Sequence, residues 1–286
     1  MSIYRILTEE ALTAPALIAA FDGWVDAGAA ATTAASFMAD GGDVVATFDA
    51  DALIDYRARR PVLDIEDGVM QELTWSEITI RRVAVSGRDL LVLTGPEPDY
   101  RWQEFRSGLV EAAVRLGVVE SVCMGAIPAM VPHTRPAPVL VTGKGRRPLD
   151  IDPPLPADHL RVPASAVNLV ELYLAEHGIP SVGFWAQIPH YVAGTYHGGA
   201  LALTERVAAH LGVHLSLEAL VEQAKDERIR LDAIVAERPE ARAYLDQLEA
   251  AGPTPIQPVP PGEDLAAEVE RFLRDTTGED RNPFET

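Results

Sequence analysis

The side chains of this sequence that could do acid–base chemistry lie mainly in loops that follow short apolar segments. Asp22 and Asp26 come after the apolar run at residues 16–21, and His133 and His190 follow two later apolar segments. Open α/β sheets bind their ligands at the carboxyl ends of parallel strands. Aspartate and histidine at that edge could transfer protons to and from a ligand. These loops are therefore the first candidates for a ligand site.

Aromatic and basic side chains accompany these four residues and complete a candidate cleft or interface. Arginine and histidine could hold an anion while the carboxylates act as acid or base. Aromatic residues and arginine are also enriched in the centres of protein–protein contacts. The candidates are Asp22, Trp24, Asp26, Arg60, Tyr100, Trp102, His133, Arg135, His190 and Tyr191.

Each of these candidates also has a purely structural interpretation. Asp22 and Asp26 precede a predicted helix, where carboxylates cap free backbone amides, and we favour capping over catalysis. Arg57, Arg59 and Arg60 could bind an anion, but ion pairs within an acidic chain explain them better. The aromatic residues could line a pocket or anchor an interface.

Catalytic and metal-binding motifs do not emerge from the sequence. It contains neither a G-x-S-x-G nucleophile motif nor a glycine-rich phosphate loop ending in Lys-Ser or Lys-Thr. Cys123 lies within an apolar segment, which is typical of an inert core thiol. His210 and His214 have the spacing of two helical metal ligands, but Gly212 between them predicts a helix end. We therefore predict no metal, no cofactor and no assembled catalytic site.

Alternating strands and helices are predicted to position these loops. Repeated strand–helix units imply a largely parallel sheet with helices on both faces. Residues 71–85 alternate in polarity and predict a pair of antiparallel strands. The other predicted strands lie at 16–21, 44–48, 90–93, 118–124, 139–141 and 182–185, and the predicted helices at 27–40, from 99 to 116, at 166–178 and up to 212.

The last third of the chain has a different organisation. Residues 1–215 form the predicted α/β core domain, and residues 216–251 form a helical hairpin whose second helix begins at Pro239. Residues 252–286 contain a proline-rich linker and then an amphipathic tail helix that Asp264 can cap. Because a lone short helix is marginal in water, this tail helix must dock on the chain itself, a neighbouring copy or a partner.

Charge restricts the possible partners. The 286 residues include 24 Lys and Arg against 43 Asp and Glu, a formal net charge of −19. Such a chain repels phosphate backbones and anionic bilayers, so we expect neither nucleic acid nor membrane as a partner. No apolar run reaches the roughly 18–20 residues that cross a bilayer, and a single cysteine fits a reducing compartment. We expect a cytoplasmic protein with a protein partner.

Five segments form a pattern that local chemistry does not explain. They are AFDGWVDAG (20–28), DYRARRP (55–61), LTGPEPDYRW (93–102), MGAIPAMVPHTRP (124–136) and GIPSVGFWAQIPHYV (178–192). Together, and in this order, they resemble the proteasome assembly chaperone two family in its actinobacterial form. The resemblance covers most of residues 1–215.

The resemblance implies a fold class and a function. The fold would be α/β, a three-layer sandwich of the phosphorylase/hydrolase-like kind with a C-terminal helical extension. The function would be that of a non-enzymatic oligomeric chaperone or scaffold, linked to proteasome subunits as protein partners, in a homo-oligomer for which a trimer is one expected form. The family's hydrophobic–tyrosine tail is not matched, because residues 282–286 contain phenylalanine and no tyrosine.

An alternative function remains open at this stage. The chain could be a small-molecule-binding protein, or an enzyme of hydrolase or ligase type, that uses the cleft at the strand ends. The two hypotheses differ in whether the candidate side chains converge in a concave pocket.

Overall fold

The fold is built on a mixed sheet of eight strands. A computed structural model describes residues 2–143 and 160–251, and all structural statements below concern these residues. The strands lie in the order β1-β3-β6-β7-β2-β8-β10-β9. Their bounds are β1 (Tyr4–Ile6), β2 (Ala16–Ala19), β3 (Asp43–Phe48), β6 (Thr79–Val85), β7 (Arg88–Thr94), β8 (Glu120–Ala129), β9 (Val139–Gly143) and β10 (Ser181–Pro189).

Only the centre of this sheet is parallel. β2 pairs in parallel with β7 and β8, and β8 pairs in parallel with β10. The other neighbours, β1–β3, β3–β6, β6–β7 and β10–β9, are antiparallel. The prediction of a largely parallel sheet is therefore wrong outside the centre. Hairpin β6–β7 and the return strand β3 extend the sheet through antiparallel pairs, which need no crossover helix.

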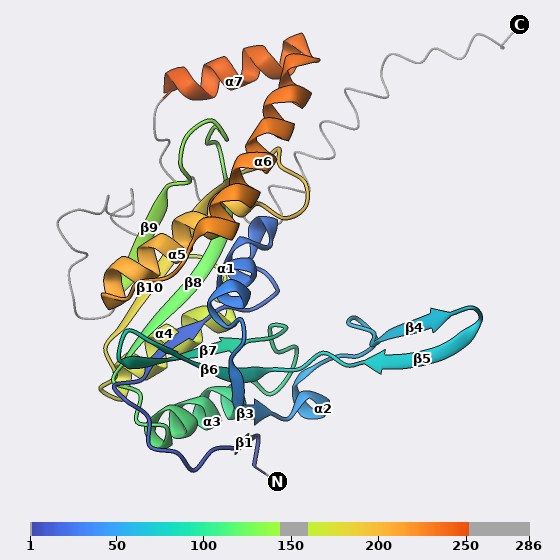
Figure 1. Cartoon of the computed structure of the whole chain (residues 1–286). Coiled ribbons are helices and arrows are strands. Elements are labelled where there is room, and N and C mark those ends of the chain that lie inside the picture. Colours follow the sequence, from blue (N-terminus) through green and yellow to red (C-terminus); the bar gives the residue numbers. More distant parts are fainter. Residues whose placement is uncertain (1, 144–159, 252–286) are drawn as a thin grey trace, which may run out of the picture.

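Helices cover both faces of the sheet, as Figure 1 shows. Helices α3 (Trp102–Arg115) and α4 (Ala166–Glu176) pack on one face, against residues such as Leu17 and Leu91. Helices α1 (Ala30–Met38) and α5 (His197–Leu211) pack on the other face, against the alternate residues such as Ile18 and Val92. This confirms the predicted three-layer α/β arrangement.

Two further helices form the C-terminal extension. α6 (Glu218–Ala236) packs on α5 through Leu220 and Leu231, and α7 (Pro239–Ala251) follows it after a tight turn. In Figure 1, α6 continues beyond the sheet and α7 turns back at that end. No helix in the described part of the chain is both long and apolar enough to cross a bilayer. The predicted loop at 149–156 and the predicted linker and tail helix at 252–286 lie outside the described residues.

The predicted helix at 27–40 is broken near its beginning. A short 3-10 turn, η1 (Ala27–Ala29), precedes α1, and Gly28 and Ala29 have φ angles of 61° and 45°. Gly28 accepts a hydrogen bond from the Tyr196 amide at 2.7 Å, and a Cβ at this glycine would lie 2.9 Å from the Tyr196 Cβ. The close approach of the loop before α5 therefore imposes this break, which a helical sequence pattern does not reveal.

Strand pairing also differs from the prediction in two places. β8 and β10 extend through residues predicted as turns, because the two strands stay in register as far as Ala129 and Pro189. Residues 71–85 do not pair with each other. β5 (Val69–Thr74) pairs with β4 (Val62–Glu66) in a separate two-stranded ribbon, and helix α2 (Ala50–Leu53) precedes that ribbon.

The pairing of Gly125 with Trp185 predicts a strong coupling between these two residues. A Cβ at Gly125 would lie 2.4 Å from the Trp185 ring. We expect Gly125→Ala to lower the free energy of unfolding by about 1–3 kcal/mol, because the ring cannot move within a packed core. Urea denaturation of Gly125→Ala, Trp185→Leu and the double variant measures the coupling. Costs that simply add would contradict this account.

Candidate functional site

The carboxyl ends of the parallel strands bring the sequence candidates into two separate groups. The loops after β2 and β7 form the first, which we call the Asp22 cluster: Asp22, Asp55, Arg59, Glu97, Asp99 and Tyr100. The loops after β8 and β10 meet helices α6 and α7 in the second, which we call the His133 cluster: His133, Thr134, Arg135, His190, Tyr191, Asp232, Tyr244 and Glu249.

The Asp22 cluster is held by backbone pairing between the loops after β2 and β7. The Asp22 amide donates to the Gly95 carbonyl at 3.0 Å, and the Glu97 amide donates to the Asp22 carbonyl at 2.9 Å. The Asp22 carboxylate forms an ion pair of 3.0 Å with Arg59. Asp22 therefore pairs with an arginine instead of serving as the helix cap that the sequence favoured.

Glu97 links this cluster to helix α4. Its carboxylate accepts from the amide of Ala166, the first residue of α4, at 2.6 Å and from the Trp24 amide at 3.3 Å. The amino end of a helix carries a partial positive charge, so a carboxylate is stabilised there. Sequence reasoning missed Glu97, although it lies within the segment 93–102, because its helix partner is about seventy positions away in the chain.

The segment 55–61 completes the Asp22 cluster. Asp55 accepts from the Tyr100 hydroxyl at 3.0 Å, and its amide donates to Asp99 at 2.7 Å. The Arg57 amide and the Tyr100 hydroxyl hold the pKa of Asp55 below its ordinary value. Trp102 donates its indole N–H to the Pro98 carbonyl at 2.6 Å. Arg60 is exposed, and its neighbour Arg59 is the arginine that pairs with Asp22.

Asp26 caps helix α1, as the sequence favoured. One carboxylate oxygen accepts from the amides of Ala31 and Thr32 at 2.8 and 3.2 Å, and the other accepts from the Thr32 hydroxyl. Burial raises the pKa of Asp26, the hydrogen bonds from Thr32 and Ala31 oppose this, and the charge of Asp22 adds to the rise. The net pKa lies above the ordinary value of an aspartate.

The His133 cluster is a chain of hydrogen bonds across three elements. The His133 amide donates to the Tyr191 oxygen at 2.8 Å, and Nδ1 of the neutral His133 ring accepts from the Tyr191 hydroxyl at 2.8 Å. Nε2 of the same ring then carries the proton and donates to Asp232 of α6 at 3.1 Å. The His133 side chain is fully buried.

Asp232, His133 and Tyr191 follow one another in the order of the acid, the base and the nucleophilic hydroxyl of a catalytic triad. A nucleophilic hydroxyl needs a base that removes its proton readily. Burial instead raises the pKa of the Tyr191 hydroxyl, so that its proton is held more tightly. The arrangement connects the strand ends to α6.

Further contacts attach helix α7 to the same loops. Arg135 donates to the Glu249 carbonyl at 2.7 Å, and Thr134 donates to the Glu249 carboxylate. Nε2 of His190 lies 3.3 Å from the Tyr244 hydroxyl, and the rings of these two residues pack edge to face. On α6, Glu227 accepts from the Gly198 amide at the beginning of α5 at 3.2 Å. Helices α6 and α7 thus cover the carboxyl ends of β8 and β10.

Sequence reasoning therefore found one half of the His133 cluster and missed the other. His133, Arg135, His190 and Tyr191 were candidates, whereas their partners Asp232, Tyr244 and Glu249 lie on helices that read as ordinary charged amphipathic segments. No spacing rule connects residues that are 54 to 114 positions apart.

A buried carboxylate under the sheet was also missed. Glu171 of α4 accepts from the Thr142 hydroxyl at 2.9 Å, and Thr142 accepts from the Trp185 indole at 2.8 Å. Burial raises the pKa of Glu171, and the hydrogen bond from Thr142 opposes the rise. Burial and the charge of Glu171 raise the pKa of the nearby Cys123 thiol, which is fully buried in the core.

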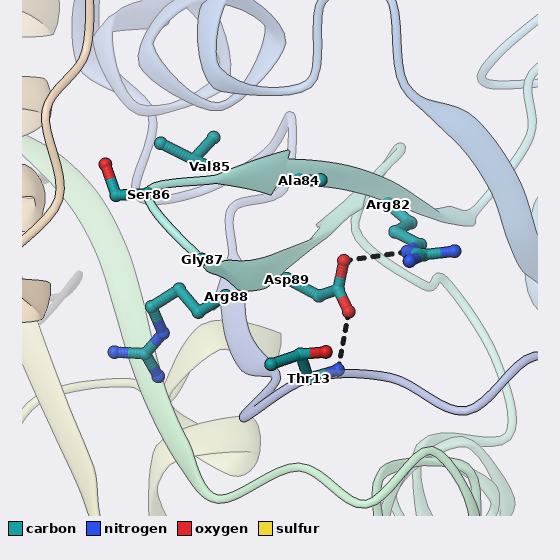
Figure 2. Close-up of a pocket in the computed structure, with 8 residues that line it drawn as sticks. All are labelled: Thr13, Arg82, Ala84, Val85, Ser86, Gly87, Arg88 and Asp89. Atoms are coloured by element: carbon teal, nitrogen blue, oxygen red, sulfur yellow. Dashed lines mark hydrogen bonds and ion pairs between the residues drawn. The ribbon is translucent and has the colours of Figure 1, made fainter.

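A shallow pocket of about 250 Å³ lies at the opposite, amino-terminal end of the sheet (Figure 2). Its charged residues are already paired: Arg82 donates to Asp89 at 2.8 Å, and Asp89 also accepts from the Thr13 amide at 2.6 Å. Burial by itself raises the pKa of Asp89, but these two hydrogen bonds outweigh it and leave the pKa lowered. The pocket is smaller than typical ligand sites, which are mostly apolar and have volumes of roughly 300–1,000 Å³.

Two aromatic candidates remain exposed at the carboxyl edge. Trp24 is 66% exposed and Tyr100 is 51% exposed, yet both belong to loops fixed by the contacts of the Asp22 cluster. Within the described residues, no group of three or more His, Cys, Asp or Glu side chains is arranged to hold a metal ion. The edge thus combines paired polar groups with two exposed aromatic side chains on hydrogen-bonded loops.

The chain is similar in sequence and in structure to known proteins from bacteria. The model of the PAC2 family matches residues 20–235. A Mycobacterium tuberculosis protein of unknown function is 33% identical, with a TM-score of 0.82 over 87% of this chain and 90% of that one. A PAC2 family protein from Streptomyces avermitilis is 33% identical, with a TM-score of 0.72 over 80% of this chain and 99% of that one.

A third relative has a name that refers to a process. It is a proteasome-assembly chaperone homologue from Mycobacterium tuberculosis, 31% identical, with a TM-score of 0.70 over 80% of this chain and 99% of that one. No curated protein matches the sequence.

The cap formed by Asp26 predicts a specific loss of stability. We expect Asp26→Ala to lower the free energy of unfolding by about 1–2 kcal/mol, because two amides and a hydroxyl of α1 lose their acceptor. Asp40→Ala, at the exposed end of the same helix, is the matched control and should change stability little.

The same aspartate predicts a pH dependence of defined sign. Because folding raises its pKa, proton binding favours the folded state. The contribution is fully present below the unfolded pKa of about 3.9 and is lost as pH rises through the higher folded value. Urea titrations from pH 7 to pH 4 should therefore show wild type gaining stability relative to Asp26→Asn. A loss over that range would contradict the raised pKa.

Proposed function

The chain belongs to the PAC2 family, and from this we propose that it acts as a non-enzymatic, oligomeric chaperone or scaffold that holds a protein partner. The observation that carries this proposal is how the polar and aromatic side chains are arranged at the carboxyl ends of the parallel strands. Asp22 pairs with Arg59, Asp26 binds helix amides and His133 binds Asp232. Trp24 and Tyr100, in contrast, are exposed on loops that hydrogen bonds hold in place. Rigid exposed aromatics are typical of interface anchors.

The partner we propose is a proteasome α-subunit. The support is a relative from Mycobacterium tuberculosis that is named a proteasome-assembly chaperone homologue. It aligns over 80% of this chain. We propose a cytoplasmic homo-oligomer, with a trimer among the expected forms, and no role for nucleic acid. The net charge of −19 supports this choice, since it disfavours polyanions.

The alternative of an enzyme or small-molecule binder has weaker support. A ligand at the ends of β8 and β10 would have to displace α6 and α7, because Asp232, Tyr244 and Glu249 contact the candidate residues there. A ligand at the ends of β2 and β7 would compete with the pairing of Asp22 and Arg59.

The test uses the purified chain and the purified α-subunits of the proteasome from the same organism. We expect a complex in sedimentation velocity and in calorimetry, and we expect Trp24→Ala to weaken it at least tenfold, or by about 1.4 kcal/mol or more. The thermal midpoint should not change, because the Trp24 ring is mostly exposed.

Val119→Ser provides the matched control. Val119 is 50% exposed and lies just before β8, at the opposite end of the sheet. This variant should bind like wild type. Absence of any complex with the α-subunits would overturn the proteasome assignment, and equal weakening by both variants would overturn the assignment of the edge.

A further inference from the structure

Glu97 connects two parts of the carboxyl edge that are far apart in the chain. Oε2 of its carboxylate accepts from the Trp24 amide at 3.3 Å, and Oε1 accepts from the Ala166 amide at 2.6 Å. Trp24 belongs to the loop after β2, and Ala166 is the first residue of α4. One side chain therefore attaches the loop that carries Trp24 to the amino end of a helix.

This pair of contacts uses both oxygens of the carboxylate as acceptors. A glutamine has the same shape, but it offers one acceptor oxygen and one NH₂ group, and that group would face an amide donor. The helix end adds a requirement for charge, because a negative group is stabilised there and hydrogen bonds to an ionised acceptor are stronger than neutral ones. The two contacts therefore favour glutamate over glutamine at residue 97.

Gly23 leaves the space that Glu97 occupies. A Cβ at residue 23 would lie 2.7 Å from both the Cβ and the Oε2 of Glu97. Gly23 is not among the glycines with a positive φ angle, so the requirement for glycine here is steric. Since residue 23 directly precedes Trp24, a side chain there would push the loop and the carboxylate apart.

A second exposed apolar side chain lies in the segment that leads into α4. Val162 is 55% exposed, and residues 161–164 are all exposed. Val162 precedes Ala166 by four residues, so the two Cα atoms are at most about 14 Å apart. Pro163 restricts the residue before it to extended backbone, and the buried Ser165 begins α4 with a capping box. Val162 is thus held close to the point where Glu97 binds the helix.

We infer that Trp24 and Val162 form one docking surface for the proteasome α-subunit, and that Glu97 is the residue that positions them relative to each other. The inference rests on the proposed function for the identity of the partner, and it adds a second anchor and a positioning residue. Anchors of protein interfaces are side chains whose conformation is largely fixed before binding. The two exposed side chains meet this condition, because one carboxylate holds the backbone of the loop and of the helix end that carry them. The partner accordingly offers an apolar surface at this place.

Binding of purified α-subunits tests the second anchor. We expect Val162→Ser to weaken the complex about threefold or more in calorimetry, because it removes an exposed apolar contact. Val119→Ser, at a residue of similar exposure, is the matched control and should bind like wild type.

The same measurement tests the positioning role of Glu97. Glu97→Gln should weaken the complex by a similar factor, whereas Glu222→Gln, which removes the same charge from an exposed position on α6, should not. In the Trp24→Ala/Val162→Ser chain, Glu97→Gln should have no further effect on binding, since nothing remains for it to position.

A second test does not depend on α-subunits. When the full chain is labelled with fluorotryptophan, each of its four tryptophans gives a fluorine resonance, and that of Trp24 is the one missing from Trp24→Phe. We expect Glu97→Gln and Gly23→Ala both to shift the Trp24 resonance and to leave that of Trp185, in the core, unchanged. Circular dichroism should show both variants folded, so that a shift confined to Trp24 reports its position and not general loss of structure.

Each outcome decides one part of the inference. A Trp24 resonance that is unchanged in both variants would overturn the positioning role of Glu97. Wild-type binding by Val162→Ser, when Trp24→Ala weakens the complex, would overturn the second anchor and leave the proposed function intact. Absence of any complex with the wild-type chain would remove the proposed partner and the anchor with it, whereas the Trp24 resonance still decides the role of Glu97. Failure of this inference and failure of the proposed function are therefore distinguishable.

Discussion

Burial of both faces of the parallel centre of the sheet is the constraint on which the rest of the structure depends. Ile18 of β2 and Leu17 beside it are fully buried on opposite faces, as are Leu91 and Val92 of β7. Such strands require a helix layer on each side, and their crossovers bring successive loops to one edge. Four of the segments that resemble a chaperone family meet at that edge because their strands β2, β7, β8 and β10 are neighbours in the sheet. The fifth, residues 55–61, reaches the edge through the contacts of Arg59 with Asp22 and of Asp55 with Tyr100.

The polar groups at this edge are stabilised by helix ends and by one another. Asp26 satisfies amides of α1, Glu97 lies at the beginning of α4 and Glu227 at the beginning of α5, so three carboxylates use the positive end of a helix dipole. His133 joins Tyr191 to Asp232 and thereby connects the sheet to α6. A site so fully occupied by internal contacts is well suited to presenting a rigid surface, and the exposed Trp24 lies on that surface.

The proposed chaperone surface and the β4–β5 ribbon present apolar groups to water in two different ways. At the edge, the aromatic rings belong to loops that internal hydrogen bonds hold in place. In the ribbon, Leu63, Ile65, Met70 and Leu73 share one face of a two-stranded element, and no third strand pairs with it among the described residues. Surfaces of the first kind bind partners with little reorganisation, because their conformation is already fixed.

The sequence by itself determined the elements whose periodicity records burial. The apolar runs at β2 and β7, the helical spacing in α3, the cap at Ser165 and the alternation of strands and helices all predicted a three-layer α/β core, because burial on a helix or strand repeats at short range. Five ordered segments also indicated the family. Only the tertiary structure decided the mixed strand order, the break at Gly28, the partners of residues 71–85, and the pairing of Asp22 with Arg59 and of His133 with Asp232. Apart from the local hairpins β4–β5 and β6–β7, these features join residues far apart in the chain, and local periodicity contains no information about such pairs.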